Sequence, residues 1–326
     1  MSPHADVLQW EHLPFPKSLR DFQRLFKDDA ACARYLEGAK WPKGFVCPHC
    51  EEKGEPFRLA ARTSVLTCRA CRKQTSLTVD TVMQRTHTPL TVWFWAAYLV
   101  SSMTPGMSAV QFQRQLGLSR YETAFQILHK LRAGMVRQGR DRIGGNISSR
   151  DHIEIDETYI GGKEANKHAS KKLRAGRGTV GKVAVMGMRE RGGRTIAKPI
   201  DAADTANIHT AIHAHVEAGS TLHTDEAKAY SGLVGLFYDH ATVNHSAGEY
   251  TRGNITTNGI ESVWAVLKRG LNGVYHHASP KHIGRYVNEF TFRLNDGNVK
   301  RQTIDRLNSM IAACVGRRIT YKELVA

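Results

Sequence analysis

The sequence lacks any unbroken apolar run of the roughly 18 residues that a membrane-spanning helix needs. Its first residues also lack a basic segment followed by an apolar stretch, which is the pattern of an export signal. We therefore expect a soluble protein of the cytoplasm, with no membrane partner.

Acidic side chains are scarce beside basic ones. The 326-residue chain has 30 Asp and Glu against 46 Lys and Arg, which gives a formal net charge of +16. The excess is spread along the chain, because residues 1–150 contain 22 basic and 12 acidic side chains and residues 151–326 contain 24 and 18. A basic balance of this kind favours a polyanionic partner, and nucleic acid is the leading candidate.

Cysteines are few, but four of the six form two close pairs. The pairs are Cys47 with Cys50 and Cys68 with Cys71, separated by 17 residues that include a predicted strand pair. This spacing is typical of a tetrahedral Zn²⁺ site, and four thiolate ligands leave no open position for chemistry. We therefore expect a structural zinc ion, with two disulfides or four unrelated thiols as the alternative. Cys32 fits a small buried side chain.

Residues 86–140 have helical periodicity. The segment 91–103 predicts an apolar helix, and residues 108–135 predict a helix, a turn at Gly117 and a second helix capped by Ser119. This outline is typical of a helix-turn-helix that binds DNA. The basic side chains expected to contact phosphates or base edges are Arg114, Arg120, Lys130 and Arg132. The alternative is an ordinary helical hairpin with a solvated basic face.

From residue 152 onward, predicted strands and helices alternate. The predicted strands cover residues 152–160, 182–190, 194–200, 220–225 and 240–244, with a helix over 205–218 after the third strand. Three strands, a helix and a further strand predict an α/β fold of RNase H type. A later helix over 258–270 places its apolar side chains on one face.

Three carboxylates stand at the ends of these elements. Asp156 and Asp225 close two strands, and Glu261 opens the helix that follows. Acids that converge at one sheet edge repel each other unless cations join them, and their oxygens suit Mg²⁺. Two such ions about 4 Å apart would stabilise an in-line phosphoryl transfer. Lys268 lies two helical turns after Glu261, on the same face, where it can hold a phosphate.

Each of these residues also has a plainer interpretation when taken alone. Asp156 fits an exposed strand end, Glu261 a charge favoured by the helix dipole, and Lys268 a solvated lysine. Among the neighbouring acids, Glu154 should share the face of Asp156, and Glu157 should point the other way.

Residues 163–182 carry seven basic side chains and one acidic side chain. Such a run is usually a solvated loop, but beside a nuclease-like site it predicts an arm that faces DNA. The residues expected to contact DNA there are Lys171, Lys172, Arg174 and Arg177.

With these motifs identified, the chain resembles bacterial insertion-sequence transposases of the ISXO-like group, which join an N-terminal zinc ribbon to an RNase H-like DDE domain. The segments that carry the resemblance are WPKGFVCPHC, CRACRKQTSLTVDTVM, HIEIDETYIGGK, HTDEAKAY and the long block over 257–295. The resemblance implies that Asp156, Asp225 and Glu261 bind two Mg²⁺ or Mn²⁺ ions, with Lys268 as their companion.

The resemblance also implies the reaction and the partners. Water would first attack a phosphodiester at the end of the element, and the freed 3′-OH would then attack target DNA. The partners would be double-stranded terminal repeats and target DNA in the bacterial nucleoid, bound by a homo-oligomer. Two alternatives stay open: a DNA-binding regulator with an inactive RNase H-like domain, and a structure-selective nuclease that cuts without joining.

The expected organisation has four parts. Residues 1–85 hold helices and the zinc ribbon, residues 86–140 the helix-turn-helix-like segment, residues 150–298 the catalytic domain, and residues 299–326 a helical tail.

Overall fold

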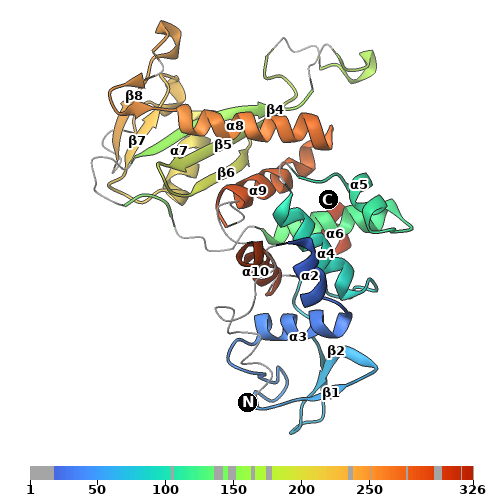
Figure 1. Cartoon of the computed structure of the whole chain (residues 1–326). Coiled ribbons are helices and arrows are strands. Elements are labelled where there is room, and N and C mark those ends of the chain that lie inside the picture. Colours follow the sequence, from blue (N-terminus) through green and yellow to red (C-terminus); the bar gives the residue numbers. More distant parts are fainter. Residues whose placement is uncertain are drawn as a thin grey trace. The chain divides into compact units, whose positions relative to one another are not determined.

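The structure is a computed structural model, and the chain in it forms two compact units (Figure 1). Unit 1 contains residues 1–137 and 296–326, and unit 2 contains residues 138–295. The structure describes residues 18–103, 106–135, 142–145, 152–162, 166–173, 178–233, 238–249, 251–276, 278–296, 303–316 and 318–325. None of the helices within these ranges has the length and apolar character that crossing a membrane requires.

Unit 1 combines helices with a small antiparallel sheet of order β1-β2-β3. The strands are β1 (Phe57–Leu59), β2 (Arg62–Thr67) and β3 (Gln74–Ser76). The helices are α2 (Leu19–Leu25), α3 (Asp29–Lys40), α4 (Leu90–Ser102), α5 (Ala109–Gln115), α6 (Tyr121–Gly134), α10 (Thr303–Cys314) and α11 (Tyr321–Val325). Helix α10 packs against α3, α4 and α6, so the segment expected as a tail contributes to the core of unit 1.

The first two helices are separated by a short break that ends at Asp28. The Asp28 carboxylate accepts a hydrogen bond from the Ala31 N–H at 2.8 Å and so caps α3. Phe22 and Phe26 on α2 pack against an aromatic cluster, in which the ring centroids of Phe22 and Tyr98 lie 4.3 Å apart. These contacts hold α2 and α3 on the apolar helix α4.

The helical hairpin of α5 and α6 forms where the sequence indicates it. Gly117 occupies the turn with a φ of 59°, a conformation that glycine adopts without steric cost. The prediction that Ser119 caps the second helix is wrong. Arg120 occupies the N-cap position of α6, and no side chain forms a capping hydrogen bond there. The turn is closed instead by the Leu118 N–H, which donates to the Gln113 carbonyl at 3.0 Å.

Unit 2 is built on a five-stranded sheet of order β6-β5-β4-β7-β8. Its strands are β4 (Ile153–Ile160), β5 (Val183–Glu190), β6 (Thr195–Ile200), β7 (Thr221–Thr224) and β8 (Asp239–Thr242). Strands β4, β5 and β6 are antiparallel neighbours, whereas β7 runs parallel to both β4 and β8. A two-stranded hairpin, β9 (Thr251–Arg252) and β10 (Ile255–Thr256), follows. This order confirms the α/β fold of RNase H type.

Helices cover both faces of this sheet (Figure 1). Helix α7 (Thr205–His215) packs on the face that carries Ile155 and Met186. Helices α8 (Asn258–Gly270) and α9 (Ile283–Leu294) pack on the opposite face, around Val185. Because successive strand residues point to opposite faces, each strand of the sheet contributes to both apolar layers.

Helix α8 approaches the sheet closely because glycines leave room for it. Gly187 on β5 pairs with Asp156 on β4, and a Cβ at position 187 would lie only 2.5 Å from the Trp264 ring. A Cβ at Gly259 would likewise meet the Glu154 carboxylate. Small residues at these points therefore set the distance between α8 and the strands that carry the acids.

We expect Gly187→Ala to destabilise unit 2 by about 1–3 kcal/mol, because the added methyl group would overpack the layer beneath Trp264. Differential scanning calorimetry of the full chain would show a lower melting temperature. The matched control is Gly273→Ala, since a Cβ at Gly273 would meet no atom within 4 Å. Equal melting temperatures for the two variants would contradict the close docking of α8.

Candidate active site

The four paired cysteines of unit 1 lie together. The sulfur atoms of Cys47 and Cys71 are 3.6 Å apart, and those of Cys50 and Cys68 are 3.7 Å apart. A tetrahedral Zn²⁺ with Zn–S bonds of about 2.3 Å separates its sulfur ligands by roughly 3.8 Å. These distances fit zinc and are far too long for a disulfide, so the geometry supports the structural zinc site expected from the spacing.

Both cysteine pairs sit in knuckles of the same design. The Cys47 N–H donates to the Glu52 carbonyl and the Cys68 N–H to the Lys73 carbonyl, each at 3.0 Å. Desolvation opposes ionisation of Cys47, but hydrogen bonds from backbone N–H groups and from the thiols of Cys50 and Cys71 lower its pKa to about 6. A backbone hydrogen bond at Glu52 favours ionisation of Cys50, but desolvation and contacts with the same group of thiols raise its pKa to about 12. This knuckle therefore favours the thiolate at Cys47 and not at Cys50.

In unit 2, the pairing of β4 with β7 brings Asp156 and Asp225 together. The parallel register pairs Glu154 with His223, so Asp225, two residues further along, follows β7 beside Asp156. Burial raises the pKa of Asp156 to about 7, and the negative charges of Glu157 and Asp225 add to this effect. A buried carboxylate whose ionisation is opposed by neighbouring acids is a natural ligand for a hard cation.

The indole of Trp264 holds the carboxylate of Asp156. Its Nε1–H donates to Asp156 Oδ2 at 2.9 Å, and its ring covers Gly187 on the neighbouring strand. One turn earlier on α8, the Ile260 N–H donates to Glu154 Oε2 at 2.8 Å. Glu154 and Asp156 thus share the face of β4 that meets α8, as their alternation predicts.

Glu261 approaches from α8, next to a turn that follows β8. Its Oε1 lies 3.4 Å from His245 Nε2, and the same nitrogen lies 3.0 Å from Thr257 Oγ1. The neighbouring Ser246 donates a hydrogen bond to Glu226, the residue after Asp225. The turn therefore contacts both the segment of Asp225 and Glu261. Unlike the four thiols, the oxygens of Asp156, Asp225 and Glu261 do not all lie within 4.8 Å of one another.

Glu157 and Tyr230 form a second layer on the other face of β4. The Tyr230 hydroxyl donates to Glu157 Oε2 at 2.5 Å, and only 1% of Tyr230 is exposed. Burial raises the pKa of Glu157, and the charge of Asp225 adds to this rise. This pair ties the segment after β7 to β4 and adds negative charge beside the two aspartates.

Two regions of the chain match models of known families. Residues 149–295 match the ISXO2-like transposase domain, and residues 27–74 match the transposase zinc-ribbon domain. The chain carries a transposase zinc ribbon followed by an ISXO2-like transposase domain. These two matches confirm the resemblance found in the sequence, and transposase domains imply DNA binding. Among curated proteins, no sequence matches this chain.

The structure separates the basic residues of the transposase that were expected to contact DNA. Arg114 and Arg120 are exposed, whereas Lys130 is half-buried and burial lowers its pKa. The prediction that Arg132 contacts a phosphate or a base is wrong, because only 2% of this residue is exposed. Its guanidinium donates a hydrogen bond to the Met107 carbonyl at 3.4 Å. Of these four residues, Arg114 near the end of α5 and Arg120 just before α6 are therefore the exposed ones.

The basic arm between β4 and β5 is described only in part. Lys171 and Lys172 are exposed, and Lys171 ends a short 3₁₀ turn over Ala169–Lys171. Arg174 and Arg177 lie outside the described residues.

Sequence reasoning missed several residues that build the site. Trp264 is identified from its position as an apolar core residue, but its bond to Asp156 requires the close docking of α8. The sequence contains one indication of the role of Gly187, because a glycine inside an apolar strand often marks a place where another segment of the chain packs closely. His245 and Tyr230 carried no signal, since both lie in short turns.

We expect Asp156→Asn to stabilise the transposase at pH 8 without added Mg²⁺ or Mn²⁺. An ordinary Asp has a pKa of about 3.9, so a folded-state pKa of about 7 means that Asp156 stabilises fully only below pH 4 and loses this contribution as the pH rises through 7. Asparagine keeps an acceptor for Trp264 but carries no charge.

The measurement is thermal unfolding of zinc-loaded protein between pH 5 and 8. The melting temperature of Asp156→Asn should exceed that of the wild type by a few degrees at pH 8, and the gap should narrow toward pH 5. Asp201→Asn, at an exposed position before α7, is the control and should follow the wild type. A gap that does not change with pH would contradict the shifted pKa.

Proposed function

We propose that this transposase cuts DNA at the ends of an insertion element and joins the freed 3′-OH to target DNA at one site. The observation that carries the proposal is the placement of Asp156 beside Asp225, where parallel β4 and β7 lie in register. Glu261 on α8 supplies the third carboxylate. Phosphoryl transfer needs little covalent chemistry from a protein, because positioning and charge stabilisation account for most of the rate.

The donor set fits Mg²⁺ or Mn²⁺. Asp156 and Asp225 would hold the cations, and Glu261 would complete their ligands; two bound ions would stabilise the attacking and leaving oxygens of an in-line displacement. The fit rests on the chemistry of the site, since Asp156 is a buried carboxylate with a raised pKa, and a divalent cation would offset the cost of its charge.

Neighbouring side chains would keep these ligands in place. Trp264 orients Asp156, and His245 restrains Glu261. Lys268, exposed two turns after Glu261, would neutralise a phosphate of the bound DNA. Ligand orientation by such partners is a common requirement of metal sites.

DNA binding would be shared among several parts of the chain. The exposed end of α5 and the start of α6, with Arg114 and Arg120, would contact an element end, and Lys171 and Lys172 would contact a DNA backbone. Joining two element ends to one target requires at least two copies of the active site, so we propose a homo-oligomer on DNA.

The proposal is tested with a labelled duplex that carries the terminal repeat flanking the reading frame, together with a supercoiled target. Wild-type protein with Mg²⁺ should produce cleaved and joined products, and EDTA added just before DNA should remove both. Asp225→Asn should give neither product and should retain its affinity for the duplex, because one carboxylate of the metal site is lost and no proposed DNA contact changes.

Three other outcomes would decide against the proposal. Cleavage by Asp225→Asn would exclude this residue from the metal site. Wild-type binding without cleavage would favour a DNA-binding regulator, and nicks without joined products would favour a nuclease. Asp201→Asn serves again as the exposed control and should cut like the wild type.

A further inference from the structure

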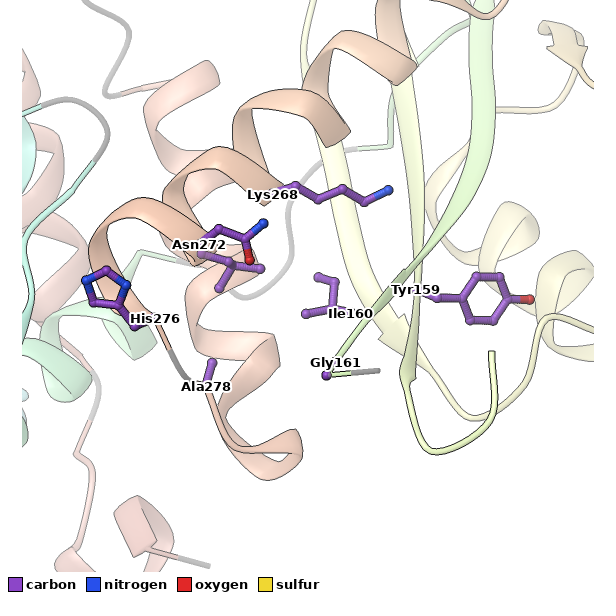
Figure 2. Close-up of a pocket in the computed structure, with 9 residues that line it drawn as sticks. Tyr159, Ile160, Gly161, Lys268, Asn272, His276 and Ala278 are labelled. Carbon is purple, nitrogen blue, oxygen red and sulfur yellow. The ribbon is translucent and has the colours of Figure 1, made fainter. Parts of the chain in front are cut away.

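A polar pocket lies between the end of β4 and the C-terminal end of α8 (Figure 2). It encloses about 280 Å³. One wall is the turn at Gly161 and Gly162, and the other is a helical segment that presents Lys268, Asn272 and His276. Asn272 and His276 have no part in the proposed chemistry.

The three polar residues lie along one side of the helical segment, as Figure 2 shows. In an α-helix, residues spaced by four drift around the axis by about 40° at each step. After Lys268, however, the chain changes into a π-helical turn over Leu271–Tyr275. A π turn takes more residues per turn, so it reverses the drift and keeps His276 in the row. Single π turns of this kind are frequent at functional sites.

Contacts with α9 fix the position of this helical segment. The Tyr275 hydroxyl donates to Glu289 on α9 at 2.7 Å, and its ring lies 4.6 Å from that of Tyr286. Gly270 lets α8 approach the Phe290 ring, which would collide with a Cβ at that position. The row of Lys268, Asn272 and His276 is therefore fixed before any ligand arrives.

Two further features point to a ligand. His276 has a φ of 54°, and a non-glycine residue held in this region stores strain that is common at binding sites. Among the described residues that line the pocket none is acidic, whereas Lys268 supplies a positive charge. One cation, an amide and an imidazole, with no carboxylate among these described residues, suit an anion.

We propose that Asn272 and His276 form a phosphate subsite for the DNA backbone, next to the phosphate that Lys268 holds. The subsite rests on the proposed function, because the row begins at Lys268, two turns after Glu261 on α8. From there the row continues along the helical segment, away from the proposed catalytic centre. Eight residues of a regular α-helix rise roughly 12 Å, so the row from Lys268 to His276, which includes the more compact π turn, is somewhat shorter than this. Successive phosphates of one strand rise about 3.4 Å along duplex DNA, so the row can follow more than one phosphate.

The dimensions favour contact with the backbone over contact with bases. A volume of about 280 Å³ is slightly below the usual range of ligand pockets, which is roughly 300–1,000 Å³. It admits a phosphodiester group but not a base pair. The Asn272 amide donates through its NH₂ group, and a neutral imidazole also carries one N–H donor, so the subsite works without protonation of His276.

The test couples side-chain removal to removal of one phosphate charge. Duplexes that carry the terminal repeat receive a single methylphosphonate at each backbone position in turn, and their affinity is measured by fluorescence anisotropy. The protein variants are His276→Gly, which tolerates a positive φ, and Asn272→Ala at an exposed helical position. His213→Ala on α7, on the opposite face of the sheet, is the control.

We expect each variant to bind the unmodified duplex about threefold to tenfold more weakly than the wild type, which corresponds to one lost hydrogen bond. At one or two neighbouring positions, a methylphosphonate should weaken the wild type but not the variant, because the contact is already missing. His213→Ala should show the wild-type profile. If Asn272→Ala and His276→Gly respond to every methylphosphonate as the wild type does, the subsite is overturned.

Cleavage by the wild type is measured in parallel to separate the two claims. Mg²⁺-dependent cleavage together with unaltered methylphosphonate profiles would reject the subsite and leave the proposed function intact. An absence of wild-type cleavage would count against the proposed function, and with it against a subsite that serves it.

Discussion

The docking of α8 on β4 and β5 is the contact on which the rest of unit 2 depends. Gly187 leaves space for the Trp264 ring, and that ring places a hydrogen-bond donor on Asp156. The same docking sets the distance of Glu261 from the strands and the position of Lys268, two turns later on α8. The contact between Gly187, which has no side chain, and the Trp264 ring thus determines the positions of the proposed catalytic groups.

The charge of the chain and the charge of its centre have opposite signs. The protein carries a net charge of +16, yet Asp156, Glu157 and Asp225 gather where the central strand β4 lies beside the end of β7. The basic surface would attract DNA over a distance of about one Debye length, roughly 8–10 Å. The acidic centre would repel it unless divalent cations are bound. This arrangement couples productive DNA binding to cation binding and offers a physical reason for metal dependence.

Local patterns in the sequence predicted much of the structure. Alternation identified β4 and the shared face of Glu154 and Asp156, because residue spacing alone decides strand faces. The buried position of Arg132 was not predictable in this way. Helix α10 packs against α6 from more than 170 residues away, so the sequence of α6 does not reveal which side becomes covered. The π turn before His276 was not predictable from its own sequence for a related reason, since the residues that pack against it are on α9.

Everything proposed for unit 2 requires that α8, Asp156 within β4 and Asp225 directly after β7 build one divalent-cation site. The most direct measurement is electron paramagnetic resonance during titration of Mn²⁺ into zinc-loaded protein, which reports the unbound ion. We expect the wild type to remove about two ions per chain from the free signal. We expect Asp225→Asn to bind markedly fewer. Equal free Mn²⁺ signals for the wild type and Asp225→Asn at every point of the titration would contradict the account.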